Sequence, residues 1–182
     1  MKTLLLLLCL APALAAAELI PVHLVKVEDG DTVVVRLGDE EVRVQLLGID
    51  APEADANPKL EVDMRRTGLT ADQLLPLGRA ASDHLHALVQ PGETLILSAD
   101  PTARDRYGRL PGELFTRDGR SLNITLVADG YARVLDKGLP ASLQQRLKRV
   151  WQAAQRNRVG LWALEPKTFR AWAGVTGPTL LQ

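Results

Sequence analysis

The sequence predicts an α+β protein that is mainly β: a five-stranded OB-fold barrel with three helices packed outside it. Five short segments have strand composition, turn residues separate the first three, and three segments place apolar residues at helical spacing. The chain has 182 residues, of which 46% are hydrophobic. That length and composition indicate one globular domain with a substantial core.

The first three strands form a predicted meander over residues 20–49. The first leads into Asp29-Gly30, a tight-turn pair in which glycine supplies a positive φ. The second, Thr32–Leu37, is rich in valine, and Gly38-Asp39 turns the chain again. The third, Glu41–Ile49, alternates polar and apolar residues, which is typical of a strand with one buried face.

The remaining elements follow a segment that we expect to be a loop, residues 54–73, which contains Pro58 and Gly68 and shows no periodicity. Helical spacing over Leu77–Leu88 predicts the first helix, and Gln90-Pro91-Gly92 ends it. Two further strands are predicted, one at Thr94–Ala99 and one within Arg109–Phe115. A helix is predicted at Ser121–Asp129, and another from Ser142 to about Arg158, with a capping box at Ser142 and Gln145. The tail over residues 165–182 is predicted to be extended.

Residues 1–17 have the pattern of a secretory signal peptide. Lys2 precedes an apolar run that begins at Leu4, and either Ala13-Leu14-Ala15 or Ala15-Ala16-Ala17 supplies small residues for cleavage. We therefore expect an exported protein, periplasmic or secreted, whose folded domain spans residues 18–164. The apolar run is too short to cross a bilayer, so we expect no membrane insertion. We also expect a monomer. The one cysteine, Cys9, lies in the signal, which excludes disulfides from the mature chain.

The formal net charge is zero, but the two halves of the chain carry opposite charge. Residues 18–103 hold 7 Lys/Arg and 16 Asp/Glu, whereas residues 104–182 hold 14 and 6. Neutrality excludes a protein that coats nucleic acid indiscriminately, but it allows a local clamp. The last helix has a basic surface that is either simply solvated or steers a substrate: Arg146, Lys148, Arg149, Arg156 and Arg158.

Two acidic clusters adjoin strand ends, at Asp29-Gly30-Asp31 and at Asp50-Ala51-Pro52-Glu53. Turn chemistry explains Asp29, but aspartate is disfavoured at the strand start that Asp31 occupies. If the two strands are neighbours, Asp31, Asp50 and Glu53 converge on an all-oxygen site, which suits Ca²⁺ rather than zinc. From these residues alone, ordinary turn and strand-exit chemistry remains equally open.

A basic cluster runs from Arg104 to Arg109 and includes Tyr107 and Gly108. Such runs are commonly solvated turns. Three arginines around an aromatic ring also suit phosphate and base recognition. Guanidinium binds phosphate through two parallel hydrogen bonds, and the ring can stack on a base. By contrast, His84 and His86 are two residues apart on a predicted helix and do not share a face, so they are not a metal pair.

Four motifs together give the sequence a recognisable signature. They are Asp-Gly-Asp-Thr at 29–32, Leu-Leu-Gly-Ile-Asp-Ala-Pro-Glu at 46–53, Asp-Arg-Tyr-Gly-Arg at 105–109 and Gly-Leu-Trp at 160–162. In this order and spacing they resemble the thermonuclease, or staphylococcal-nuclease-like, family over about residues 20–164. The resemblance implies an OB-fold barrel with three helices and Ca²⁺-dependent cleavage of phosphodiesters in DNA and RNA.

The resemblance also implies roles for individual residues. Asp31 and Asp50 match carboxylates that bind the metal, and Ala51 matches a position that binds it through the backbone carbonyl. Glu53 matches the glutamate usually assigned as general base for the attacking water. The implied cation is therefore Ca²⁺, held by Asp31, Asp50 and Ala51.

The arginine positions show one departure. Arg109 matches the arginine that clamps the phosphate, and Arg106 and Tyr107 match positions that contact the nucleotide. The family's second catalytic arginine corresponds to Gln45, which has no charge and no guanidinium fork. Arg43 lies two residues earlier on the same strand face, and its long side chain is a candidate substitute.

Two functional hypotheses follow. The first is an exported Ca²⁺-dependent nuclease that acts on single-stranded DNA or RNA, which the retained carboxylates and Arg109 favour. The second is a catalytically impaired module of the same fold that binds nucleic acid or protein, which Gln45 favours.

Overall fold

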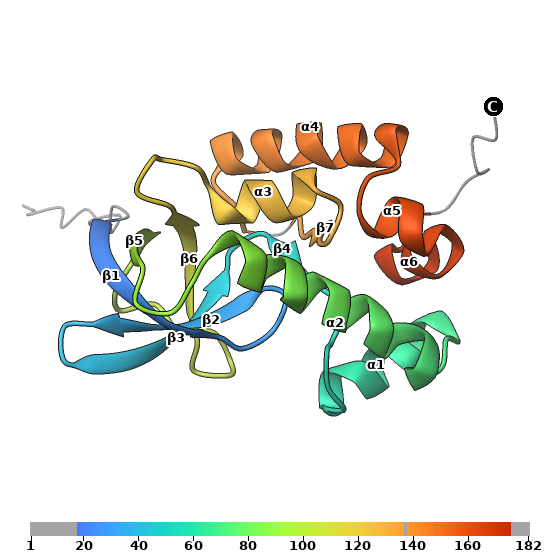
Figure 1. Ribbon diagram of the computed structural model, residues 1–182, viewed down its shortest axis with the longest axis horizontal. Helices are drawn as coiled ribbons and strands as arrows, with labels where there is room; N and C mark the ends of the chain where they lie inside the picture. The colour runs from blue at the N-terminus through green and yellow to red at the C-terminus, as the bar shows by residue number, and fades with distance from the viewer. Residues whose placement is uncertain (1–17, 137, 176–182) are drawn as a thin grey trace, which may run out of the picture.

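Five strands close into a barrel, as the sequence predicts (Figure 1). The computed structural model describes residues 18–136 and 138–175, so the predicted signal at 1–17 and the end of the tail lie outside the described residues. The barrel order is β1-β2-β3-β6-β5, in which β3 and β6 run parallel and the other neighbours antiparallel. Its strands are β1 (Glu18–Val27), β2 (Thr32–Leu37), β3 (Glu40–Leu46), β5 (Thr94–Ala99) and β6 (Leu110–Phe115).

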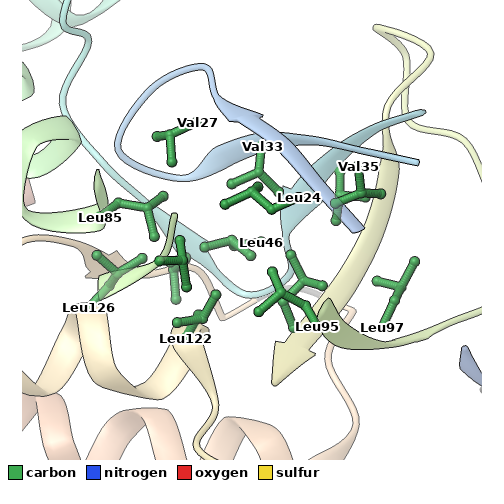
Figure 2. Close-up of a cluster of buried hydrophobic side chains, with 14 of the residues drawn as sticks. Leu24, Val27, Val33, Val35, Leu46, Leu85, Leu95, Leu97, Leu122 and Leu126 are labelled. Carbon is green, nitrogen blue, oxygen red and sulfur yellow. The ribbon is translucent and has the colours of Figure 1, made fainter. Parts of the chain in front are cut away.

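The barrel interior is filled by alternating aliphatic side chains from these strands. Val33 and Val35 of β2 and Leu46 of β3 have no exposed surface (Figure 2). Leu85 and Leu126 close the cluster from the helices outside. Burial of each such side chain contributes roughly 1.5–3 kcal/mol, so the alternation noted in the sequence fixes which strand face points inward.

A second, two-stranded sheet lies beside the barrel where the acidic cluster begins. Its strands, β4 (Ile49–Asp50) and β7 (Arg133–Val134), pair antiparallel and place Asp50 opposite Arg133. The buried Asn123 anchors the chain that leads into β4, because its amide nitrogen donates to the carbonyl of Leu47 at 2.9 Å. The position of Asp50 is thus set by backbone pairing and by a buried polar contact.

The expectation of a loop over residues 54–73 is wrong. Helix α1 (Pro58–Thr67) occupies most of it, and α2 (Ala71–Leu88) begins earlier than predicted. The Asn57 side chain caps α1 by accepting from the Leu60 amide at 2.9 Å, and Gly68 ends it at φ 72°. Pro58 stands in the first turn, where a missing amide proton costs nothing, so these residues are start and stop signals for a helix.

The other two predicted helices are present. In α3 (Leu122–Ala128), which lies within the predicted Ser121–Asp129, the Ser121 hydroxyl accepts from the Ile124 amide and caps the helix. Helix α4 (Ala141–Asn157) begins one residue earlier than expected, with Pro140 rather than Ser142 at its N-cap, so the capping box is wrong. Figure 1 shows α3 and α4 stacked against each other outside the barrel.

The expectation of an extended tail after Glu165 is wrong for the part that the structure describes. After the single-turn helix α5 (Leu161–Leu164), α6 (Pro166–Ala173) packs at the end of the molecule that holds α1 and α2 (Figure 1). Phe169 and Trp172 are fully buried there in a second core with residues of α1, α2 and α4. The domain therefore extends past residue 164. None of the helices described is long and apolar enough to cross a membrane.

Candidate active site

A groove of about 930 Å³ lies where the ends of β2 and β3, the short β4, helix α1 and the turn before β6 meet. Residues far apart in the sequence line it together. Of the site residues predicted above, it is lined by Asp31, Arg43, Gln45, Asp50, Glu53, Arg106, Tyr107 and Arg109. Ala51 is buried and is not among the residues that line the groove.

Asp31 lies in the floor of the groove with 6% of its surface exposed. Its carboxylate accepts from the Ala51 amide at 2.8 Å and lies 3.0 Å from the Thr32 hydroxyl. Burial, reinforced by the charges of Asp29 and Asp50, raises the pKa of Asp31 to about 7. The contacts of Asp31 with positive charge and hydrogen-bond donors therefore do not fully offset the cost of burying its charge.

Gly30, beside Asp31, is required for packing. Its φ is not positive, which corrects the role expected for it in the turn. A Cβ atom there would lie 2.8 Å from the Cβ atoms of both Ala51 and Ala81. The glycine therefore lets the Asp31 turn approach α2 and Ala51, the residue after β4, closely.

Asp50 is held between two cations. One carboxylate oxygen lies 2.9 Å from Lys59 Nζ, and the other accepts from Arg133 Nε and Nη2 at 2.8 and 2.7 Å. Arg133 also donates to the carbonyl of Trp172 at 2.9 Å and stacks over that indole ring. Helix α6 therefore supports the orientation of Asp50 through Arg133.

Glu53 follows β4 and is nearly buried. Its two carboxylate oxygens are bound separately, one by Lys59 Nζ and the other by the Asn57 amide at 2.5 Å. The backbone at Glu53 rests directly on α2, since a Cβ atom at Gly78 would lie only 2.0 Å from the Glu53 carbonyl oxygen. Glu53 is therefore fixed both at its backbone and at its carboxylate.

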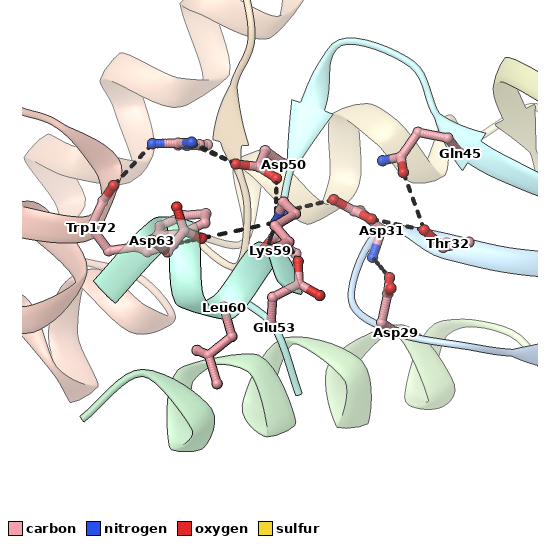
Figure 3. Close-up of polar contacts among 12 residues, drawn as sticks. Asp29, Asp31, Thr32, Gln45, Asp50, Glu53, Lys59, Leu60, Asp63 and Trp172 are labelled. Atoms are coloured by element: carbon pink, nitrogen blue, oxygen red, sulfur yellow. Dashed lines mark hydrogen bonds and ion pairs between the residues drawn. The ribbon is translucent and has the colours of Figure 1, made fainter. Parts of the chain in front are cut away.

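Lys59 joins these groups (Figure 3). Its ammonium contacts Asp50 and Glu53 and donates to the Ala51 carbonyl at 3.3 Å. Burial lowers the pKa of Lys59, but the charges of Asp50, Asp31 and Glu53 outweigh burial, so that its pKa is raised and the ammonium stays charged.

The donor types around Lys59 suit a hard cation such as Ca²⁺, but their present arrangement does not fit one. Among residues 18–136 and 138–175, no three Asp, Glu, His or Cys side chains are grouped so that they could hold a metal ion. Lys59 already contacts two of the three acceptors expected for Ca²⁺, Asp50 and the carbonyl of Ala51.

Arg109 enters the groove from the start of β6. Its Nε donates to Asp105 at 2.8 Å, and its Nη1 donates to the Thr32 hydroxyl at 3.2 Å. Burial raises the pKa of Asp105, but hydrogen bonds from Arg109 and Tyr107 lower it by more, so it stays ionised. The guanidinium is thus oriented while some of its five N–H groups remain available for an anion.

Gln45 and Arg43 lie beside Arg109 but differ in their partners. The Gln45 side-chain oxygen lies 3.2 Å from the Thr32 hydroxyl, which also accepts from Arg109. Arg43 is paired with Glu28, to which its Nε donates at 2.8 Å. The edge of Arg43 formed by Nε and Nη2 is therefore occupied by Glu28, and it is open to a phosphate only when this pair separates.

Arg106 and Tyr107 form the exposed rim of the groove. The Arg106 guanidinium lies 4.7 Å from the centre of the Tyr107 ring, and 56% of the tyrosine surface is exposed. An exposed ring beside guanidinium groups can stack on a base while the arginine contacts a phosphate.

Several charged and aromatic residues of this site are not indicated by the sequence. Lys59 and Asp63 lie in α1, where the sequence predicts a loop, and Trp172 lies in α6, where the sequence predicts an extended tail. The buried Asp63 accepts from Trp172 Nε1 at 2.9 Å and from Arg66 Nη2 at 2.8 Å. The Asn57-Pro58 pair was the available signal for α1, whereas nothing local to Arg133 indicates its pairing with Asp50.

Comparisons with known proteins show which sequences this chain is similar to. The sequence model of the family described as "Staphylococcal nuclease homologue" matches residues 43–164. The chain is 34% identical over 110 residues to "Endonuclease YhcR" of Bacillus subtilis, a match that covers 59% of this chain but only 8% of that protein. It is 29% identical over 141 residues to an "Uncharacterized endonuclease" of Escherichia coli, covering 78% of this chain and 76% of that one. It is 28% identical over 143 residues to "Thermonuclease" of Staphylococcus intermedius, covering 77% and 75%.

Proposed function

Because this chain belongs to the staphylococcal nuclease family, we propose that it hydrolyses phosphodiester bonds of single-stranded DNA or RNA in the groove described above. The observation that carries the proposal is the convergence of Asp31, Asp50, Glu53 and Arg109 on one groove. The printed names of several relatives, endonuclease and thermonuclease, support the same class of reaction.

In this proposal Arg109 binds the scissile phosphate. Its guanidinium is already oriented by Asp105 and Thr32, so little rearrangement is needed as negative charge grows on the phosphate oxygens. Arg106 and Tyr107 hold the neighbouring nucleotide at the rim.

Glu53 is the proposed general base. It would accept a proton from the water whose oxygen bonds to phosphorus, while the bond from phosphorus to the leaving oxygen breaks. Both of its oxygens are hydrogen-bonded to Lys59 and Asn57. Each oxygen accepts one of these bonds, which leaves lone-pair sites at which the carboxylate can take the proton.

Ca²⁺ dependence remains a prediction from the family resemblance. If Ca²⁺ binds, Asp31, Asp50 and the Ala51 carbonyl would hold it, and the positive charge of the ion would offset the negative charge of the phosphate. Lys59 has to move away from Asp50 and Ala51 first. The roles given to Arg109 and Glu53 rest on their own contacts.

We also propose that residues 1–17 direct export, so that the protein acts in the periplasm or outside the cell. Support comes from the charged start, the apolar run and the small residues before Glu18, where β1 begins. N-terminal sequencing of the protein recovered from the producing cells tests this: we expect a start near Glu18, and a retained residue 1 contradicts it.

Cleavage of labelled single-stranded DNA and RNA by the purified mature protein, in Ca²⁺ and in chelator, tests the proposed nuclease. We expect both Glu53→Gln and Arg109→Ala to lose cleavage by at least about 100-fold. Arg36→Ala is the matched control, because Arg36 pairs with Glu41 and does not line the groove. Absence of cleavage by the wild-type protein at high enzyme concentration, in either condition, contradicts the proposal.

The second candidate is a binding module without useful catalysis. Gln45 supplies no charge, and both oxygens of the Glu53 carboxylate already accept hydrogen bonds from the protein. Fluorescence anisotropy on the same oligonucleotides separates the candidates: tight binding without cleavage favours the module, whereas turnover favours the nuclease.

A further inference from the structure

We propose that the Lys59 ammonium is a built-in substitute for the divalent cation, so that Lys59 and a free cation exclude each other from the acidic cluster. This inference deepens the proposed function and rests on it for the identity of the site. It assigns to one side chain of α1 control over how readily the protein binds Ca²⁺.

Lys59 contacts groups that are also expected to bind Ca²⁺. Its Nζ lies 2.9 Å from Asp50 Oδ1 and 3.3 Å from the Ala51 carbonyl oxygen, and it also binds Glu53. The first two groups are acceptors expected for Ca²⁺, which takes carboxylate and carbonyl oxygens at 2.3–2.6 Å. One position among these oxygens therefore serves either cation.

The helix that carries Lys59 fixes the ammonium in place. Lys59 is the second residue of α1, whose start is capped by Asn57. The next residue, Leu60, is buried against α2, and Asp63 one turn later binds the Trp172 indole (Figure 3). The ammonium is thus delivered by an anchored element.

The charges around Lys59 also favour exclusion of a second cation. The cluster gathers the carboxylates of Asp31, Asp50 and Glu53, all nearly buried, and Lys59 is the cation placed between Asp50 and Glu53. Bringing Ca²⁺ to the same oxygens sets a divalent and a monovalent cation within a few ångströms of each other, and their repulsion is strong in a partly buried site. Exclusion follows from this repulsion and from the shared ligands.

The side chain can nevertheless leave. Some 37% of the Lys59 side chain is exposed, and a lysine stem has four rotatable bonds with which to turn the ammonium toward water. We therefore expect wild-type protein to be folded without Ca²⁺ and to bind it only at a concentration high enough to displace Lys59.

Calcium titration of folded protein tests this without any substrate. Thermal unfolding and isothermal titration calorimetry are followed with increasing CaCl₂ for the wild type and for Lys59→Met, which keeps a long side chain but removes the charge. We expect Lys59→Met to have a lower Tm in chelator and to respond to at least roughly tenfold less Ca²⁺ than the wild type. Lys59→Arg keeps the charge and should resemble the wild type. Lys26→Met makes the same substitution at an exposed site in β1 and should change nothing.

Several results overturn the inference. They are equal Ca²⁺ affinity in the wild type and Lys59→Met, weaker affinity in Lys59→Met, a gain of affinity in Lys59→Arg as large as in Lys59→Met, and no Ca²⁺ binding by any variant. Should Lys59→Met be unfolded in chelator, circular dichroism shows whether Ca²⁺ restores the fold, and failure to restore it also overturns the inference. None of these readouts uses hydrolysis, so loss of the nuclease proposal alone leaves them interpretable.

Discussion

Gln45 is the residue at which this groove departs most from the chemistry that the family resemblance implies. Its amide shares the Thr32 hydroxyl with Arg109, so the side chain lies beside the proposed phosphate site but brings no charge to it. A guanidinium at this position would add a bidentate donor for the phosphate oxygens as their charge grows. Gln45 therefore occupies a place beside Arg109 from which an arginine could contact the phosphate, but it supplies no charge.

We predict that Gln45→Arg raises kcat/KM for single-stranded DNA by on the order of 100-fold, the typical contribution of one preorganised donor to a transition state. Initial rates over a range of substrate concentrations measure it. Gln45→Lys is the matched control, because it adds the charge without the planar fork and should gain less. A rate unchanged by Gln45→Arg would show that the phosphate does not lie beside β3.

At the residue scale, the sequence predicted those site residues that belong to short local motifs. Asp31, Asp50 and Glu53 adjoin strand ends, and Arg109 lies in a compact basic turn, so each carried a local signal. Lys59 carried none, because its contacts depend on where α1 docks. The pairing of Asp50 with Arg133 was also out of reach, since it follows from the register of β4 with β7, which are 83 residues apart at these positions.

At the element scale, the strands were predicted well and the second core was not. Alternation and turn residues define a strand within a few positions, and the barrel then follows from burying one face of each strand. Helices α1 and α6 were missed because proline and glycine mark both loops and helix ends. What makes Pro58–Thr67 and Pro166–Ala173 helical is their packing on α2 and on each other, which is a tertiary property.

The contact between α2 and the Glu53 backbone gives an element-scale prediction. Gly78→Ala would place a Cβ atom 2.0 Å from the Glu53 carbonyl oxygen, so α2 must move or the segment after β4 must shift. We expect a loss of about 2–4 kcal/mol in the free energy of unfolding, measured by urea denaturation, together with loss of cleavage. Arg79→Ala, at the exposed neighbouring position, should change stability by no more than about 0.5 kcal/mol. Native stability in Gly78→Ala would mean that the two elements are not in close contact.

The link between α1 and α6 gives a prediction with a defined pH dependence. Burial raises the pKa of Asp63, but hydrogen bonds from Arg66 and Trp172 and the charge of Lys59 lower it by more, so its folded-state pKa lies below the ordinary 3.8. A lowered pKa stabilises the folded protein above the unfolded-state pKa, and this stability is lost as the pH falls through the folded-state pKa.

Asp63→Asn should therefore cost about 1–3 kcal/mol of unfolding free energy at neutral pH, and the difference from wild type should shrink below a pH of about 4. Urea unfolding at several pH values between neutral and about 3 measures the difference. Glu61→Gln is the control, because the Glu61 side chain is 71% exposed on the same helix. A cost that does not change with pH would assign the role of Asp63 to packing rather than to charge.

At the scale of the whole molecule, the acidic and basic halves of the chain meet in the groove. The half before residue 104 supplies Lys59 and the carboxylates of Asp31, Asp50 and Glu53, and the half after it supplies Arg106, Arg109 and Arg133. The zero net charge therefore describes a molecule in which charges of both signs are concentrated at one site. The basic surface of α4 is separate, since the groove is lined by none of its residues.

This separation predicts how salt affects binding to single-stranded DNA. Each phosphate contact contributes about −0.7 to the slope of log K against log salt, so a clamp built on Arg106 and Arg109 should give a slope of about −1.4. Fluorescence anisotropy of the cleavage-deficient Glu53→Gln protein, between about 50 and 200 mM salt, measures this slope. Arg106→Gln should make it shallower by about 0.7, whereas Arg149→Gln combined with Arg156→Gln, both exposed on α4, should leave it unchanged. If the α4 variant instead flattens the slope, then that surface steers the nucleic acid, and the binding site extends well beyond the groove.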